Sequence, residues 1–139
     1  MALRIALVLV ALAVLAGCRT SPYGETPEEL VVQTRTFADI VRWRPLHKMY
    51  AFLKTEPERP VSVQEGLENV RVTGYELTEP LNEIAPPEPG KPWRWRQAAQ
   101  IDYVLTDRQV VRQLFDLQVW ESEDQGKTWY RTTPVPVFK

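Results

Sequence analysis

The chain has 139 residues, and its 17 basic and 18 acidic side chains give a net charge of −1 at neutral pH. This balance excludes the strongly basic face that nucleic-acid binding requires. Five Trp, five Tyr and four Phe can fill one core, whereas the single cysteine excludes an intrachain disulfide and a cysteine-rich metal site. We therefore expect a chain long enough for one domain, with no nucleic-acid partner, no metal and no cofactor.

The first 17 residues have the features of a secretory signal peptide. Arg4 precedes the apolar run of residues 5–15, and the small residues Ala16 and Gly17 follow it. This run has about eleven residues, whereas a membrane-spanning helix needs roughly 20. We expect residues 1–17 to direct export and then to be removed.

The motif Leu15-Ala16-Gly17-Cys18 resembles the lipobox of bacterial lipoproteins. In that family the cysteine sulfur takes a diacylglyceryl group, the chain is cut before the cysteine, and the new amine is acylated with a chain such as palmitate. The resemblance implies a lipid anchor on Cys18, with Leu15, Ala16 and Gly17 recognised by the signal peptidase. Arg19, rather than Asp, follows the cysteine, which implies the outer membrane, facing the periplasm. An ordinary signal peptide with a chance cysteine is the alternative.

Residues 18–25 are expected to form a short polar tether between the lipid and the domain. At Thr26 the pattern changes, because Thr26, Pro27 and Glu29 have the form of a capping box with proline in the first turn. Apolar side chains then recur at helical spacing until Pro45, which ends the helix near residue 44. The predicted stripe is Leu30, Thr34, Phe37 and Val41, widened by Val31, Ala38 and Ile40.

Two shorter helical segments are expected next. The first covers about residues 46–53, and its shared side is Leu46, Met49, Tyr50 and Leu53. The prolines of residues 55–60 then force a turn. Ser62-Val-Gln-Glu65 has the form of a second capping box and predicts one or two helical turns that end near Glu68.

Residues 70–77 alternate as a strand does, but the apolar positions before and after Gly74 are out of phase. One extra residue restores the register, so we expect a β-bulge at Gly74. Residues 80–92 contain five prolines and are expected to form an extended loop.

The clearest alternation lies in residues 93–105, interrupted only by Gln97, and its apolar face is Trp93, Trp95, Ala99, Ile101, Tyr103 and Leu105. After a turn at residues 106–108 we expect a return strand that directs these side chains inward: Val111, Phe115, Leu117 and Val119. Residues 123–126 predict a hairpin loop with Gly126 at positive φ, followed by a last strand over residues 127–132. Residues 134–139 are assigned to a C-terminal tail, because Pro134 and Pro136 end strand pairing.

Helices followed by an antiparallel meander predict an α+β domain over residues 26–133, with N-terminal helices packed on one face of a curved antiparallel sheet. This order resembles the NTF2-like (cystatin-like) superfamily. Three local matches carry the resemblance: residues 50–53 with 57–59, residues 62–67, and residues 120–130. It implies a cone whose concavity holds the helices, and a different helix-on-sheet arrangement is the alternative. The superfamily includes isomerases and dehydratases as well as many non-catalytic members.

The ionisable candidates have simpler structural explanations. His47 is the only histidine, and a catalytic role requires it to enter the concavity with Asp39 beside it, whereas a surface position is the simpler alternative. Asp102 and Asp116 fall outside the apolar phase of their strands. We expect them in cross-strand pairs on the convex face, Asp102 with Arg112 or Asp116 with Arg96.

The aromatic face of the predicted sheet offers a small-ligand pocket against the helices, and its expected lining is Phe37, Trp93, Trp95, Tyr103 and Phe115. Since no coherent catalytic set is present, we expect a non-catalytic binding or scaffolding module. Its partner would be an envelope protein, docking on the sheet edge or the proline-rich loop. A small-ligand-binding protein and an enzyme of isomerase or dehydratase type remain the alternatives.

Overall fold

The computed structural model describes residues 25–85 and 87–139. The signal peptide and lipobox, with Leu15, Ala16, Gly17 and Cys18, lie outside the described residues. The elements in chain order are α2 (Glu28–Trp43), the 3₁₀ helices η1 (Leu46–Phe52) and η2 (Leu67–Asn69), and the strands β1 (Val70–Glu83), β2 (Trp93–Leu105), β3 (Val110–Ser122) and β4 (Tyr130–Arg131). The strands form one antiparallel sheet in the order β1-β2-β3-β4. The predicted α+β class is confirmed.

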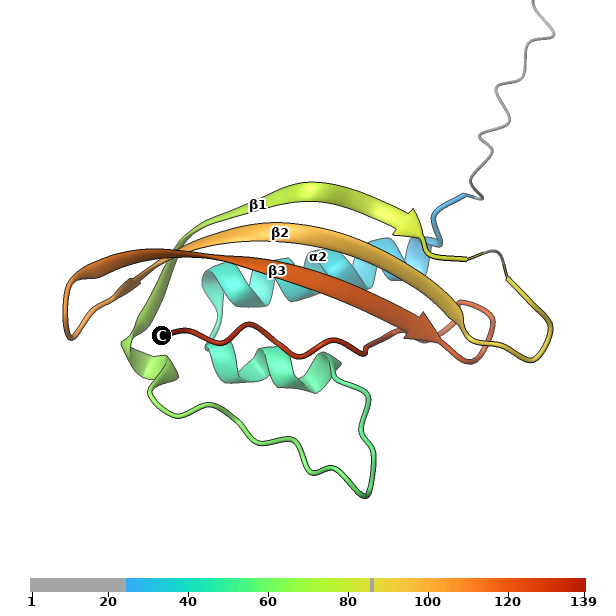
Figure 1. The fold of residues 1–139 in the computed structure, drawn as a ribbon, viewed down its shortest axis with the longest axis horizontal. Helices are drawn as coiled ribbons and strands as arrows, with labels where there is room; N and C mark the ends of the chain where they lie inside the picture. The colour runs from blue at the N-terminus through green and yellow to red at the C-terminus, as the bar shows by residue number, and fades with distance from the viewer. Residues whose placement is uncertain (1–24, 86) are drawn as a thin grey trace, which may run out of the picture.

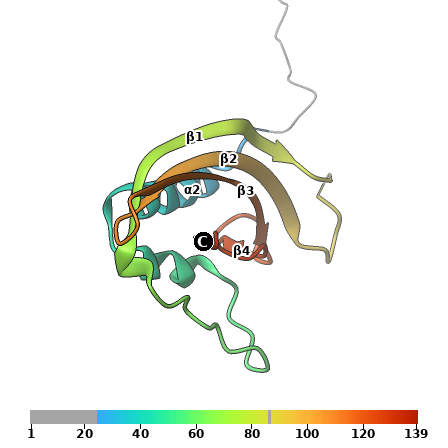
Figure 2. The same cartoon turned by 60° about the vertical axis from the view of Figure 1, so that its left-hand side comes forward.

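The sheet is arched, and the helices lie on its concave side. Figure 1 shows β1, β2 and β3 passing over α2, with η1 further below. Figure 2 shows the C-terminal end of the chain inside the arc, between α2 and η1. The concave face is therefore covered by three segments, two helical and one extended. No helix of the described residues is long and apolar enough to cross a membrane.

Helix α2 packs through the stripe that its sequence predicts. Leu30, Thr34, Phe37 and Val41 are its buried residues, at the spacing of one helix face. The residues predicted to widen the stripe are only partly buried: Val31, Ala38 and Ile40. The predicted cap is wrong, however, because Pro27 holds the N-cap position and no side chain caps the helix. The Pro27 carbonyl accepts the first helical hydrogen bond, from the Val31 N–H at 3.1 Å.

The second predicted capping box, at residues 62–65, does not begin a helix. Only Leu67–Asn69 is helical, after Gly66 at a φ of 77°. Gln64 explains the difference, because its backbone N–H and its side-chain amide form hydrogen bonds with residues distant in the sequence and not with a neighbouring helical turn. Its backbone N–H donates to the Tyr50 hydroxyl at 2.9 Å, and its side chain pairs with both backbone groups of Phe138, at 2.6 and 3.1 Å.

Strand β1 contains the predicted β-bulge, since its register with β2 shifts between Val72 and Gly74. A Cβ on Gly74 would lie 2.9 Å from the Asp102 Oδ2 atom, so a larger residue there would displace the Asp102 side chain. The strand then continues through Pro80 to Glu83, beyond the predicted start of the loop. An edge strand tolerates proline because its outer N–H groups have no ladder partner.

Strand β2 covers the predicted residues, and its predicted face is buried except for Trp93, which is half-buried. Gln97, which interrupts that face in the sequence, is also buried, at 2% exposure. The phase of β3 is the reverse of the prediction. Asp116, Gln118, Trp120 and Ser122 are buried, whereas Val111, Phe115 and Leu117 are exposed by 75%, 70% and 53%. The predicted alternation is present, but its apolar positions lie on the exposed face, because the inward-facing Asp116 and Gln118 bond Arg131 and Tyr75 on the concave side.

The core is aromatic and is completed by the end of the chain. Phe37, Phe52 and Trp120 meet edge to face, with ring centroids 5.4 to 6.1 Å apart. The Phe138 ring meets the Tyr103 ring in the same way at 5.0 Å. Val135 and Phe138 are only 6% and 3% exposed, so residues 134–139 belong to the packed domain and are not a separate tail.

The predicted hairpin loop is present between β3 and β4, with Gly126 at a φ of 88°. Asp124 organises it, because Asp124 Oδ1 accepts hydrogen bonds from the Ser122 hydroxyl and from the N–H groups of Lys127 and Thr128. The Thr128 hydroxyl donates to Asp124 Oδ2. The bonds from Thr128 come first among the causes that lower the pKa of Asp124 to about 2.

Candidate functional site

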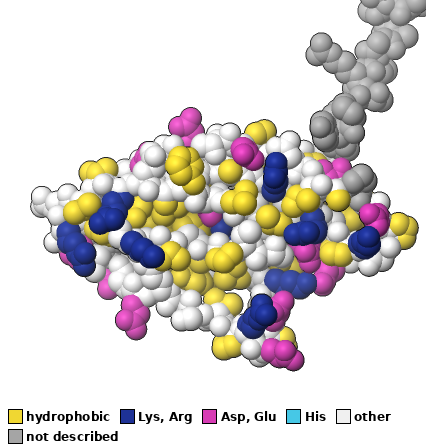
Figure 3. All heavy atoms as spheres, in the orientation of Figure 1, with side chains coloured by type: hydrophobic (Ala, Val, Ile, Leu, Met, Phe, Trp, Pro, Cys, Tyr) yellow, Lys and Arg dark blue, Asp and Glu magenta, His cyan; other side chains and the backbone are white. Residues whose placement is uncertain are grey.

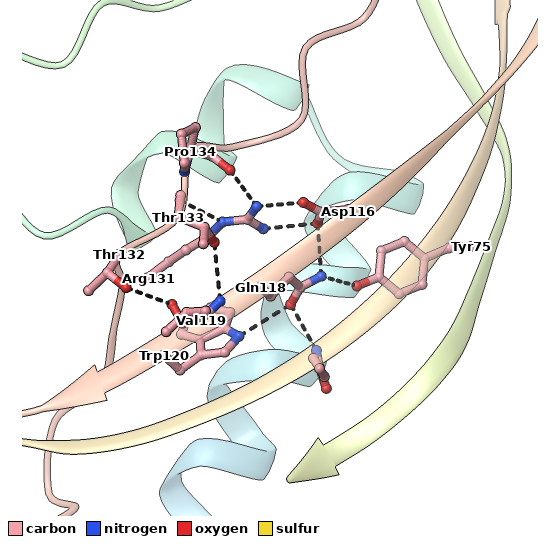
Figure 4. A network of polar contacts seen from close by, with 10 residues as sticks. Tyr75, Asp116, Gln118, Val119, Trp120, Arg131, Thr132, Thr133 and Pro134 are labelled. Carbon is pink, nitrogen blue, oxygen red and sulfur yellow. Dashed lines mark hydrogen bonds and ion pairs between the residues drawn. The ribbon is translucent and has the colours of Figure 1, made fainter. Parts of the chain in front are cut away.

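A buried ion pair lies under the sheet, where sequence patterns did not place one. Arg131 of β4 donates from Nη1 to Asp116 Oδ2 at 2.9 Å and from Nη2 to Asp116 Oδ1 at 2.5 Å. The two side chains are 0% and 3% exposed. Arg131 also donates to the carbonyl groups of Thr133 and Pro134, and its guanidinium lies 5.0 Å above the Phe37 ring. Figure 4 shows this arrangement.

Gln118 extends the ion pair into a network that reaches β1. Its Nε2 donates to Asp116 Oδ2 at 2.9 Å and to the Tyr75 hydroxyl at 2.7 Å. Its Oε1 accepts from Gln97 and from the Trp120 ring N–H. Burial raises the pKa of Tyr75 to about 12, and the Asp116 carboxylate adds to the rise, whereas the bond from Gln118 and the charge of Arg131 oppose it.

This network is closed, so its chemistry is structural. Both Asp116 oxygens accept hydrogen bonds from within the protein, and no buried polar side-chain atom among the described residues lacks a partner. A general base needs a free lone pair that a substrate can approach. Asp116 has no such access, because it is only 4% exposed.

The predicted convex-face ion pairs are wrong. Asp116 faces inward to Arg131, while Arg96 lies opposite Val119 in the β2–β3 register. Asp102 does lie on the convex face, but its Oδ1 accepts from Gln113 at 2.8 Å and not from Arg112. The register explains this, because it places Asp102 opposite Gln113 and moves Arg112 to the other face.

The remaining catalytic candidate is on the surface. His47 is exposed on η1, and the described residues provide no hydrogen bond or ion pair between it and Asp39. Among residues 25–85 and 87–139, no cluster of three or more His, Cys, Asp or Glu side chains has the arrangement of a metal site.

The predicted pocket lining is not brought together around a cavity. Phe37, Trp95 and Tyr103 are core residues, at most 4% exposed. Trp93 is half-buried against the hairpin loop, where a Cβ on Gly126 would lie 3.0 Å from its ring. Phe115 projects from the opposite, convex face. The C-terminal segment fills the concavity that these aromatic residues were expected to surround.

An open groove of about 400 Å³ lies on the surface between η1, the loop after it and the C-terminal segment. Its apolar lining includes Leu53, Pro60, Val61, Val135 and Val137. The ionisable side chains on its border are Tyr50, Lys54, Glu56 and Arg59. Lys54 is already paired with Glu121 and Glu123, at 3.5 and 2.5 Å. The groove therefore has no concentration of free charge that selects a ligand.

The outer edge of β3 is the most distinctive exposed feature of the described residues. The backbone N–H and C=O of Val119 point away from β2. Its carbonyl accepts the Thr132 N–H at 2.9 Å, and its N–H donates to the Thr133 hydroxyl. The β2–β3 register has no shift, so alternate residues before Val119 direct their backbone groups the same way. These are Val111, Gln113, Phe115 and Leu117, and no described group bonds their outward N–H and C=O.

The same edge carries an exposed apolar stripe. Val111, Phe115 and Leu117 lie on the convex face, with Val104 and Ala98 of β2 opposite Val111 and Leu117. Figure 3 shows hydrophobic side chains gathered across the middle of the surface that carries β3 and the C-terminal segment. The exposed area of the three β3 side chains is on the order of a few hundred Å², the size of the largest apolar patch on a typical monomer, and such patches are often functional.

The two edges of the sheet differ in how they are protected. The β1 edge has three register irregularities, a proline at position 80 and the exposed acids Glu76 and Glu79. Proline, charge and bulges are the devices that keep an edge strand from pairing with another chain. The β3 edge has none of them between Val110 and Gln118 except one exposed charge, Arg112. It is regular and available for pairing.

Comparison with known proteins adds no relative. No family model matches the chain, and neither a curated protein nor a solved structure is significantly similar to it. The functional assignment therefore depends on the sequence motif at Cys18 and on the geometry described above.

Proposed function

We propose that this chain is a bacterial envelope lipoprotein whose exported domain is a non-catalytic protein-binding module. Residues 1–17 would direct export, and lipid on Cys18 would hold the protein on the outer membrane, facing the periplasm. The lipobox resemblance supports the anchor. The helices in the concavity of an arched sheet support an NTF2-like cone as the finer description of the fold.

The open apolar edge of β3 is the observation that carries the binding function. A partner in extended conformation adds a strand there, since backbone hydrogen bonds provide affinity and alternate side chains provide specificity. Val111, Phe115 and Leu117 offer three exposed apolar contacts at the spacing of alternate strand residues. The closed network around Asp116 argues against the isomerase or dehydratase alternative, and the packed core argues against the predicted ligand pocket.

The tether sets where binding occurs. Residues 18–25 span at most about 30 Å, because an extended chain covers no more than about 3.5 Å per residue. A domain anchored at Cys18 therefore meets its partner close to the bilayer surface.

Site-specific photo-crosslinking in intact cells tests this proposal. A photoreactive amino acid at Gln113, on the open edge, is expected to form protein adducts, whereas the same residue at Thr78, in the protected β1 strand, is not. Phe115→Lys is expected to abolish the adducts at position 113, because the ammonium group would stand in the apolar stripe. Val32→Lys is the matched control, since Val32 is 57% exposed on α2 and away from the sheet.

Equal adducts at positions 113 and 78, or adducts unchanged by Phe115→Lys, would show that the β3 edge is not the binding surface.

A further inference from the structure

Helix α2 ends in the most exposed tryptophan of the chain. Trp43 is 71% exposed, and the other four tryptophans are buried or half-buried: Trp93, Trp95, Trp120 and Trp129. The Arg42 guanidinium lies 4.9 Å from the centroid of the Trp43 ring. Tryptophan, with its apolar body and polar N–H, is enriched where a membrane meets water, so an exposed ring beside a cation suits a bilayer surface.

Positive charge is concentrated around this ring. The segment between Asp39 and Glu56 has no acid and four basic residues, although the whole chain has a net charge of −1. These are Arg42, Arg44, Lys48 and Lys54. Lys54 is paired with Glu121 and Glu123, whereas no described acid forms an ion pair with the other three.

The acids near this segment do not cancel its charge. Asp39 is exposed one helical turn before Trp43, and the three bases leave an excess of two positive charges when it is counted. Glu65 and Glu68 line a separate surface hollow together with His47. The region around Trp43 therefore attracts anions.

We propose that the headgroups of anionic phospholipids bind a tryptophan patch formed by Arg42, Trp43, Arg44 and Lys48. The inference rests on the lipid anchor of the proposed function and adds a second contact with the same bilayer. Guanidinium and ammonium groups bind the headgroup phosphates, and the ring enters the boundary between headgroups and acyl chains. The partner of this face is a lipid surface and not a protein.

The length of the tether allows this contact. Residues 18–25 span at most about 30 Å, and α2, with 16 residues, is about 24 Å long. Glu28 and Trp43 are the first and last residues of α2, about four turns apart, and both lie on the side opposite its buried stripe. The tether and the patch are therefore on the same side of one helix, and α2 can lie along the bilayer.

Charge determines the tilt of the helix on the membrane. Glu28 and Glu29 at its beginning are repelled by an anionic surface, whereas the patch at its end is attracted. The end at Trp43 therefore lies closest to the headgroups. Phe37, on the buried side of α2, packs against Trp120 of β3. The sheet thus lies on the side of α2 away from the bilayer, and the β3 edge remains accessible to a protein partner.

The anchor makes a small patch sufficient. Each Arg or Lys beside an anionic surface raises the bound population only about fivefold, and salt screens the attraction. Three bases and one ring would hold a free domain weakly. With lipid on Cys18 in the same bilayer the contact is intramolecular, so the anchor supplies a high effective concentration of headgroups.

Quenching of tryptophan fluorescence by a nitroxide-labelled lipid tests the contact, because Trp43 is the tryptophan that such a lipid can approach. The full lipidated protein is reconstituted into phosphatidylcholine vesicles that contain about one-third phosphatidylglycerol, and into vesicles of phosphatidylcholine alone. We expect quenching in the anionic vesicles and quenching at least about twofold weaker in the neutral ones. Trp43→Phe is expected to abolish the difference.

Arg44→Glu with Lys48→Glu tests the charges without changing the contact between Arg42 and the ring. Quenching in anionic vesicles is expected to fall to the level of the neutral ones. Arg71→Glu with Arg96→Glu is the matched control, since it makes the same change of net charge at exposed positions of β1 and β2, and it is expected to keep the quenching. If the reversal unfolds the domain, Arg44→Gln with Lys48→Gln repeats the test without placing acids at the end of α2.

Equal quenching in the wild type and in Trp43→Phe, or quenching that neither substitution of Arg44 and Lys48 lowers, would overturn the inference. If the protein carries labelled palmitate and floats with the vesicles while Trp43 stays unquenched, the patch does not bind lipid and the anchor stands. Capture of a protein by a photoreactive residue at position 43, without quenching, would likewise show that the lipid contact is wrong. A protein without palmitate would show that both the anchor and the membrane contact are wrong.

Discussion

At the scale of single residues, Arg131 determines how the concave side is organised. Its guanidinium bonds Asp116 of β3 and two carbonyl groups of the C-terminal segment, and it lies over Phe37 of α2. A charge taken out of water is tolerated only where a partner and hydrogen bonds replace the water. This one side chain therefore requires three separate segments to be in place.

Replacing Arg131 by methionine is expected to lower the free energy of unfolding by about 3–5 kcal/mol, because the Asp116 carboxylate would stay buried without its partner. Urea unfolding followed by tryptophan fluorescence measures the change. Lys91→Met is the control, since the Lys91–Glu88 pair is exposed and its loss is expected to have little effect. A variant as stable as the wild type would mean that Asp116 is solvated.

Tyr75 makes stability depend on alkaline pH. Its pKa is about 12 in the folded protein against an ordinary value of 10.0. Between pH 10 and 12 the unfolded chain loses this proton while the folded protein keeps it, so stability is complete below pH 10 and falls as pH rises. The loss for this group is on the order of 2–3 kcal/mol. Tyr75→Phe is expected to remove that part of the alkaline decline, measured by urea unfolding at each pH.

Tyr130→Phe, at a position 39% exposed, serves as the control and is expected to keep the full decline. The same decline in Tyr75→Phe as in the wild type would show that the phenol is not held neutral by burial.

The sequence patterns did not predict which polar residues are buried in the site. Alternation indicated that Gln97 interrupts an apolar face, and this position is buried. It did not identify Asp116 and Gln118 as buried, because period-two rules assign polar residues to solvent. Their partners are Arg131 and Tyr75, which lie 15 and 43 positions away in the chain. Only the folded arrangement shows that these groups satisfy one another.

At the scale of elements, local signals were reliable where packing agreed with them. The α2 stripe, the full length of β2, the bulge at Gly74 and the turn at Gly126 were all predicted and are confirmed. Residues 62–65 and the face of β3 were predicted wrongly. In both cases distant partners decide the conformation, Phe138 for Gln64 and Arg131 for Asp116. Propensity and periodicity describe neighbours in sequence and do not include such bonds.

The C-terminal segment is an element of the core, although it has no regular secondary structure. Phe138→Ala is expected to lower the free energy of unfolding by about 3–5 kcal/mol, because the ring is 3% exposed against Tyr103. Val137→Ala, at a position 54% exposed, is expected to change it by no more than about 0.5 kcal/mol. Thermal or urea unfolding of the two variants distinguishes them. Equal effects would mean that residues 134–139 are not packed as described.

At the scale of the whole molecule, the sheet has one protected edge and one available edge. Bulges, Pro80 and two acids protect β1, whereas β3 is regular and apolar along its exposed side. The proposed partner strand therefore has one edge of the described sheet to add to, that of β3.

The proposed anchor predicts how the whole protein is distributed in the cell. Cys18→Ala is expected to abolish incorporation of labelled palmitate and to slow removal of residues 1–17, because the sulfur that carries the lipid is missing. Metabolic labelling and gel mobility measure both effects. Arg19→Ala, beside the lipidated residue, is expected to keep the label. Unchanged labelling and processing in Cys18→Ala would exclude a lipoprotein.

The burial of Arg131 and Phe138 has a consequence for truncation. Trp129, Arg131, Val135 and Phe138 are all buried. Removal of residues 129–139 would leave Asp116 without its counter-charge and Tyr103 without its aromatic neighbour. The three long strands and the helices therefore do not contain all the groups that cover and neutralise their own concave side, and a fragment without residues 129–139 is expected to lack a stable native state.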